Sequence, residues 1–298
     1  MLAIAGLYLM AVLSGRLLAV LSKSTVRQVA GWSLTGILVW LGHRVLEDRE
    51  ALARMVGICV VLLGGMKATV YAEWAVGKRL TMRRYVVFAV LWFGMNPGDF
   101  VRRVSGLGWK RDLLVGVLLT ITGTGLAWWV WWSGWRQVVL MFVPLSIAFH
   151  FGILRMLKAF LRLAGFPVRT LFGNVLATNG MADFWGRRWN AGYTQMMQRL
   201  VGRPVGSRWG PAAGLLAVFL VSGLLHECAI TLPVQTGFGL PTAYFLLQGI
   251  LTLGEKRLGR AVGAIPTLLA VGLPLGLLFP PVFRREVMER CLELFRHL

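Results

Sequence analysis

One histidine of this sequence lies inside a long apolar stretch, where an ionisable side chain is costly to bury. His226 occurs in the run LVSGLLHECA, residues 220–229. On a helix, Ser222 and Gly223 lie one turn before it on the same face, so they leave room beside the imidazole and Ser222 could hydrogen-bond it. Because histidine titrates near neutral pH, this pattern favours a general base that takes a proton from a reacting group.

Other interpretations of this histidine compete with catalysis. It could pack between helices and hydrogen-bond across a bundle. The sequence has no second histidine three or four residues away and no HExxH pattern, so no metal site is predicted. Glu227 projects about 100° away from His226 on a helix, and we expect it to pair with an arginine of another helix. His150, in another apolar run, is the competing candidate for the base.

A second polar segment is DFWGRRWN, residues 183–190. If residues 183–200 form one helix, aromatic side chains recur on one face: Trp185, Trp189 and Tyr193. Polar side chains then occupy the nearly opposite face: Asp183, Arg187, Asn190 and Thr194. This polar set could orient a substrate. The alternative is a helix at the membrane interface, with its tryptophans at headgroup depth and Asp183 bound to Arg187 in a simple salt bridge.

The composition predicts an integral membrane protein. The 298 residues are 57% hydrophobic, with a mean hydropathy of +0.67, whereas soluble domains are about 45–50% apolar. Continuous apolar runs long enough to cross a bilayer recur along the chain. Backbone groups in lipid must be paired within the segment, so these runs are expected to be helices.

The strong positive charge fits the same interpretation. The chain has 32 Lys and Arg residues against 12 Asp and Glu, a net charge of +20. In a soluble protein this excess would suggest nucleic acid. Here the basic residues fall between the apolar runs, where they would meet anionic lipid headgroups, so membrane lipids and no nucleic acid are the predicted partners.

The elements that must position the two segments are predicted from the apolar runs. These runs cover residues 3–22, 30–42, 55–75, 85–96, 112–132, 137–154, 211–232, 239–254 and 263–282. Residues 155–182, broken by glycine and proline, predict short interfacial pieces, and the tail from Arg284 predicts an amphipathic surface helix. We therefore expect an all-α fold: one domain over residues 1–298, a bundle of about eight transmembrane helices with interfacial amphipathic helices.

Two motifs resemble a known family. The run FWGRRWN at 184–190, followed by SGLLHE at 222–227, resembles the core of wax synthase-type proteins of the membrane-bound O-acyltransferase superfamily. Asn190 and His226 are 36 residues apart, which fits the family pattern. Upstream, WFGMNP at 92–97 resembles a Trp-Pro-Gly-Met stretch, with Phe93 in place of proline. The likeness is clear over residues 174–256, the predicted catalytic core, and fainter over 85–110.

The resemblance implies transfer of an acyl group from a thioester, usually acyl-CoA, to a hydroxyl, which in wax synthases belongs to a long-chain alcohol. His226 matches the family histidine and would be the base. Asn190 matches the family asparagine and would polarise the thioester carbonyl or position the reactants. Acyl-CoA is then a co-substrate, with no cofactor and no metal. Arg187 and Arg188 are candidates for the CoA phosphates.

The remaining residues of the two motifs are expected to shape and orient the site: Asp183, Trp185, Trp189, Ser222 and Glu227. Alternatives stay open at this stage. The acceptor hydroxyl could belong to diacylglycerol, a sterol, a terpenoid alcohol or a glycan. The chain could also be a membrane transporter, or a lipid-binding scaffold that does not need His226. In each case we expect a multi-pass membrane protein, located in the cell membrane if it is bacterial.

Overall fold

A computed structural model of the chain describes residues 2–135 and 137–293, and within these ranges no strand occurs. The α-helices are α1 (Leu2–Leu18), α2 (Ser24–Val45), α3 (Ala51–Trp74), α4 (Met82–Leu91), α5 (Lys110–Ser133), α6 (Val138–Ser146), α7 (Leu154–Leu163), α8 (Met181–Asp183), α9 (Ala191–Met197), α10 (Arg203–Trp209), α11 (Pro211–His226), α12 (Leu232–Val234), α13 (Leu240–Leu258), α14 (Ala264–Gly272), α15 (Leu275–Leu278), α16 (Pro281–Phe283) and α17 (Arg290–Glu293).

Several of these helices are joined end to end by π-helical turns, and two short 3-10 turns lie in the connections. The π-helical segments are η2 (Ile147–Ile153), η4 (Phe184–Arg188), η5 (Gln198–Gly202), η6 (Glu227–Thr231) and η7 (Arg284–Glu289). The 3-10 turns are η1 (Pro97–Phe100) and η3 (Val175–Ala177). Single π-helical turns inside helices frequently occur at functional sites. Here η4 and η6 belong to the two segments that carry the candidate residues.

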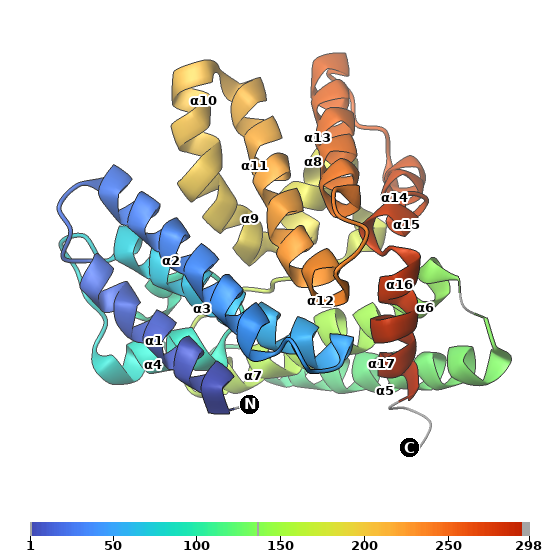
Figure 1. Cartoon of the computed structure of the whole chain (residues 1–298), viewed down its shortest axis with the longest axis horizontal. Coiled ribbons are helices and arrows are strands. Elements are labelled where there is room, and N and C mark those ends of the chain that lie inside the picture. Colours follow the sequence, from blue (N-terminus) through green and yellow to red (C-terminus); the bar gives the residue numbers. More distant parts are fainter. Residues whose placement is uncertain (1, 136, 294–298) are drawn as a thin grey trace.

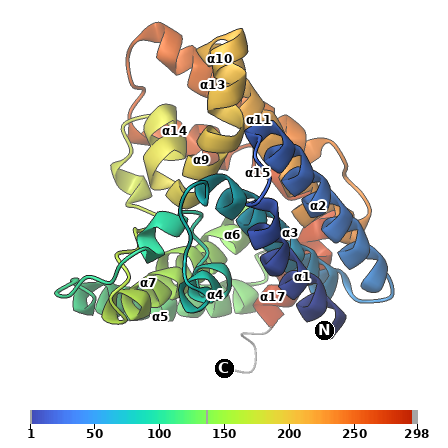
Figure 2. The ribbon, with the colours of Figure 1, turned by 90° about the vertical axis from the view of Figure 1, so that its left-hand side faces the viewer.

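The helices form one bundle (Figure 1). In it α3 packs against α1 and α2, α5 packs against α6 and α7, and α11 packs against α10 and α13. The views in Figures 1 and 2 agree that α5 and α7 run along the base, while α10 and α13 rise at the top. Within the segment 181–202, α8 packs against α13 and η5 packs against α11, so the two candidate motifs lie together in the bundle.

The all-helical membrane fold is confirmed, but the expected number of about eight spans is not. Four helical stretches are long and apolar enough to cross a bilayer: Ala51–Trp74, Lys110–Ser133, Val138–Leu163 and Pro211–Val234. A fifth is possible if Ala264–Leu278 and Pro281–Glu293, which bend by 87°, count as one span. The other predicted runs form helices that are shorter or less apolar, such as α1 with 17 residues.

The tail from Arg284 is helical and amphipathic as predicted. Its apolar face packs into the core through Val287, Met288 and Leu292, each less than 5% exposed, while Arg285, Glu286 and Arg290 are exposed. Residues 294–298 of this tail lie outside the described ranges. The prediction of short interfacial pieces over residues 155–182 needs correction. Residues 155–163 continue the preceding helix as α7, and only the following stretch to Gly180 is irregular, with η3 as its one turn of helix.

Candidate active site

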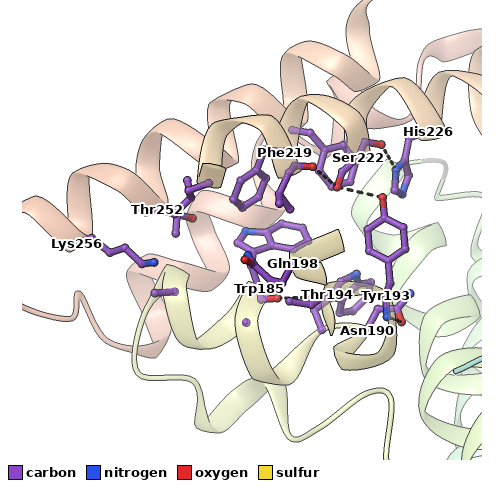
Figure 3. A pocket seen from close by; sticks show the side chains of 16 residues that line it. Trp185, Asn190, Tyr193, Thr194, Gln198, Phe219, Ser222, His226, Thr252 and Lys256 are labelled. Carbon is purple, nitrogen blue, oxygen red and sulfur yellow. Dashed lines mark hydrogen bonds between the residues drawn. The ribbon is translucent and has the colours of Figure 1, made fainter. Parts of the chain in front are cut away.

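A cavity of about 160 Å³ opens where the segment 182–198 meets α11 and α13 (Figure 3). Its walls are formed by Ala182, Trp185, Gly186, Trp189, Asn190, Tyr193, Thr194, Gln198, Leu215, Val218, Phe219, Ser222, His226, Phe245, Thr252 and Lys256. The fold therefore brings the predicted asparagine and the predicted histidine to one cavity, although they are far apart in the sequence.

The imidazole of His226 is held in one orientation at the end of α11. Its Nδ1 lies 2.6 Å from the backbone carbonyl oxygen of Ser222. A carbonyl oxygen can only accept, so Nδ1 donates its proton, and in the neutral ring Nε2 then keeps the lone pair of a base. The ring also lies 4.2 Å, centroid to centroid, from Phe245.

Ser222 supports the imidazole, but through its backbone. Its hydroxyl, which we expected to bind the ring, instead donates to the carbonyl of Val218 at 2.7 Å. A serine hydroxyl inside a helix commonly bonds the carbonyl one turn earlier. The next residue, Gly223, lets α13 approach closely, since a Cβ there would lie 2.7 Å from the Cα of Thr242.

Asn190 occupies a backbone conformation that few residues tolerate. Its φ and ψ are 42° and 58°, in the left-handed region where asparagine is enriched among non-glycine residues. Its Oδ1 accepts the backbone N–H of Tyr193 at 3.2 Å and so caps the start of α9. The Nδ2 group has no hydrogen-bond partner among the described residues. The Oδ1 atom thus stabilises the start of α9, and the Nδ2 group remains available as a donor beside the cavity.

The prediction of one helix over residues 183–200 is wrong. The π-helical η4 ends at Arg188, Trp189 is extended with φ −104° and ψ 117°, and the left-handed Asn190 precedes α9. This break turns the chain. As a result Trp185, Trp189 and Asn190 line the same cavity instead of lying on opposite faces.

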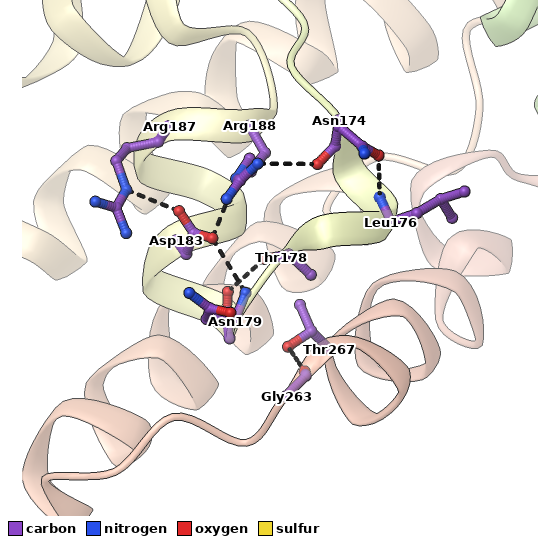
Figure 4. A network of polar contacts seen from close by, with 10 residues as sticks. Asn174, Leu176, Thr178, Asn179, Asp183, Arg187, Arg188, Gly263 and Thr267 are labelled. Atoms are coloured by element: carbon purple, nitrogen blue, oxygen red, sulfur yellow. Dashed lines mark hydrogen bonds and ion pairs between the residues drawn. The ribbon is translucent and has the colours of Figure 1, made fainter.

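Asp183, which is not among the lining residues, holds this turn through a network of polar contacts (Figure 4). Its carboxylate accepts the Nε of Arg187 at 2.7 Å and the Nε of Arg188 at 3.1 Å, and it also accepts the N–H of Asn179 at 3.1 Å. Burial alone would raise the pKa of Asp183, but these three donors hold that pKa below its usual range. The predicted salt bridge to Arg187 is confirmed, and neither arginine lines the cavity.

Glu227 pairs with no arginine of the described ranges, so that prediction is also wrong. Its carboxylate accepts the hydroxyl of Thr231 at 2.6 Å, the N–H of Gly239 at 3.1 Å, and both the N–H and the hydroxyl of Thr242, at 3.0 and 2.7 Å. Two of these donors are N–H groups at the start of α13 that have no partner within the helix, and such groups attract a negative charge. Glu227 therefore fixes α13 to the end of α11 just beyond His226.

Two tryptophans enclose the space between the walls. Trp185 packs edge-on against Phe219, with centroids 5.9 Å apart, and its buried Nε1 has no hydrogen-bond partner in the part of the chain that the structure describes. A ligand could accept a hydrogen bond from that N–H. Trp189 packs against the ring of His150 at 5.5 Å. His150, the competing base, is not among the lining residues, and its Nδ1 lies 3.0 Å from the hydroxyl of Ser146.

The lining residues without a prediction of function from the sequence include Tyr193, assigned only to the aromatic face, and Lys256. Lys256 lies at the end of the lining opposite His226 (Figure 3). It is separated from Phe245, which touches the imidazole, by eleven residues of α13, a helical rise of roughly 16 Å. The helical spacing of Phe245, Thr252 and Lys256 indicates that they share one face of α13. That this face lines a cavity depends on α11, which forms the opposite wall.

These features define a multi-pass helical membrane protein with a buried site that offers one base and two free donors. Residues 168–247 match the model of the membrane bound O-acyl transferase family. Over these residues the chain is similar to the family, which agrees with the resemblance found in the sequence.

The relatives are named as long-chain-alcohol O-fatty-acyltransferases. The chain is 32% identical to the probable long-chain-alcohol O-fatty-acyltransferase 9 of Arabidopsis thaliana over 157 residues, which are 45% of this chain and 46% of the relative. It is 33% identical to the long-chain-alcohol O-fatty-acyltransferase of Simmondsia chinensis over 107 residues, 33% of this chain and 30% of the relative. The chain thus spans less than half of the length of these relatives.

Asn190 has two structural roles, a left-handed backbone conformation and a side-chain cap of α9, and both can be tested by measuring protein stability. Asn190→Gly removes the cap but keeps a residue that accepts the left-handed conformation, whereas Asn190→Ala loses both. We expect the alanine variant to be less stable than the glycine variant by about 1 kcal/mol. The melting temperature of the purified protein in detergent measures this. If alanine proves equal to or better than glycine, as in an ordinary helix, the left-handed turn does not constrain position 190.

Proposed function

We propose that the chain transfers a fatty acyl group from acyl-CoA to the hydroxyl of a long-chain alcohol, forming a wax ester. The observation that supports this most directly is the cavity between Asn190 and His226. There the Nε2 of His226 and the Nδ2 of Asn190 have no hydrogen-bond partner within the described residues, while the second polar atom of each side chain is bound by the backbone. The names of the relatives support the same class of reaction.

The reaction then follows from these two groups. His226 Nε2 takes the hydroxyl proton as the alcohol oxygen attacks the thioester carbon, and a C–O bond forms. The carbonyl electron pair moves to oxygen, where the Nδ2 group of Asn190 donates a hydrogen bond to the developing charge. The carbonyl re-forms as the C–S bond breaks. The departing thiolate takes the proton from the imidazolium, giving the ester, free CoA and neutral His226.

The shape of the cavity suits lipid substrates. Its middle is lined by apolar side chains such as Leu215, Val218 and Phe219, which exclude water from the thioester. Its volume of about 160 Å³ is below the roughly 300–1,000 Å³ of common ligand pockets. The cavity therefore holds the reacting groups, and the long chains of both substrates extend beyond it. We propose acyl-CoA as the co-substrate, with no cofactor.

The anionic end of acyl-CoA is assigned to Lys256 in this proposal. Its ammonium group is the only charged side chain among the lining residues, since the His226 base is neutral, and it lies at the far end of the lining. The sequence favoured Arg187 and Arg188 for the CoA phosphates, but both bind Asp183 away from the cavity.

The catalytic assignment is tested by acyl transfer from labelled acyl-CoA to a panel of alcohols in detergent. Wild type should form ester with a long-chain alcohol. His226→Ala should lose at least about a thousandfold in kcat, and Asn190→Asp, which keeps the Oδ1 cap but lacks the N–H donor, about a hundredfold. Both variants must keep the wild-type melting temperature. Equal activity in His226→Ala would remove it as the base, and ester formed only with a sterol, diacylglycerol, terpenoid alcohol or glycan would reassign the acceptor.

The role of Lys256 predicts a different kinetic change. Lys256→Ala should raise the KM for acyl-CoA about tenfold with kcat nearly unchanged, because a hydrogen bond to a charged group contributes about 1.5–3 kcal/mol. Arg187→Ala, which alters a cation outside the cavity, is the matched control and should leave KM unchanged. The opposite result, with KM raised only in Arg187→Ala, would place the CoA phosphates on the Asp183 side of the segment.

A further inference from the structure

Tyr193 joins the two walls that carry the candidate residues. It lies in the first turn of α9, and its backbone N–H donates to Asn190 Oδ1 at 3.2 Å. Its side chain crosses to α11, where the hydroxyl donates to Ser222 Oγ at 3.1 Å (Figure 3). One residue therefore contacts Asn190 through its main chain and α11 through its side chain.

The serine that receives this bond also holds the imidazole. Ser222 offers its carbonyl to His226 Nδ1 at 2.6 Å, and its own hydroxyl donates to the Val218 carbonyl at 2.7 Å. Because that proton is committed to Val218, Ser222 Oγ acts as the acceptor and Tyr193 as the donor. Burial raises the pKa of the Tyr193 hydroxyl, which keeps it protonated for this bond.

The start of α9 packs tightly against Leu171 and Gly94, so the backbone from which the Tyr193 side chain extends is held in place. At the neighbouring Gly192, a Cβ would lie 2.8 Å from Leu171 Cδ2 and 3.2 Å from the Cα of Gly94. The carbonyl of Gly94 is in turn held by the Nζ of the fully buried Lys67 at 2.6 Å. The start of α9 therefore packs against the loop at 92–95, and the Tyr193 side chain links it to α11.

We infer that Tyr193 is a positioning residue that sets the separation between the Asn190 donor and the His226 base. This inference rests on the proposed acyl transfer at the same cavity. Without the Tyr193 hydroxyl the two walls lose the one side-chain hydrogen bond that links α9 to α11 beside the imidazole. The reacting groups then sample a wider range of separations, and a small misplacement of such groups lowers the rate rather than substrate binding.

The test is a double-mutant cycle. Tyr193→Phe and Ser222→Ala remove the two ends of one hydrogen bond, and each should lower kcat about threefold to tenfold while the KM for acyl-CoA stays unchanged. The double variant should be no slower than the slower single variant, since both changes break the same link. Tyr244→Phe is the matched control, because its buried hydroxyl donates to the Val271 carbonyl at 3.1 Å outside the cavity. It should leave kcat unchanged.

A second readout does not depend on ester formation. The rate at which diethyl pyrocarbonate modifies His226, followed by mass spectrometry, should fall by the same factor in Tyr193→Phe, Ser222→Ala and the double variant, because a less firmly held carbonyl polarises Nδ1–H less. It should not change in Tyr244→Phe. If wild type forms no ester, the proposed function fails while this readout still tests the link. Multiplied effects in the double variant, a change in KM alone, or wild-type kcat and modification rate in Tyr193→Phe would each overturn the inference.

Discussion

Each buried polar group in this apolar bundle must find a partner inside the protein, because lipid offers none. The structure meets this constraint even at costly positions. The ammonium group of Lys67 is fully buried and donates to the carbonyls of Phe88 and Gly94, at 2.8 and 2.6 Å. The carboxylate of Glu227 takes bonds from Thr231, Gly239 and Thr242. Exceptions among the described residues are buried side-chain atoms of His43, Arg54, Trp185, Gln248 and Arg284, which have no hydrogen-bond partner. Of these five residues only Trp185 lines the cavity, together with Asn190, and there a substrate would supply the missing bonds.

In each of the two candidate residues, one polar side-chain atom binds the backbone and the other is available to a substrate. Asn190 uses Oδ1 to cap α9 and keeps Nδ2 free, and His226 uses Nδ1 on the Ser222 carbonyl and keeps Nε2 free. A group held in this way needs little reorganisation when charge develops in a transition state. The same bonds that stabilise the helix ends therefore orient the groups that would react. Close approach of α13 at Gly223 completes the enclosure.

Sequence reasoning succeeded where one physical property dominates. Long apolar runs predicted the position of most helices, because burying backbone polar groups in lipid leaves few alternatives. It failed where a single residue leaves regular structure. Helical periodicity placed Asn190 opposite Trp185 and Trp189, but the extended Trp189 and the left-handed Asn190 bring all three to one cavity. It also missed that the N–H groups at the start of α13 would satisfy Glu227.

Composition and short motifs are local properties of the chain, and they were enough to predict a membrane protein, the family resemblance, and Asn190 and His226 as candidate residues. Packing between distant segments establishes which atoms of these two residues are free, that Lys256 and Tyr193 share their cavity, and that Arg187 and Arg188 do not. The reason is geometric. Which side of a broken helix faces a neighbouring helix depends on backbone angles at the break and on the packing of segments distant in sequence, and periodicity specifies neither.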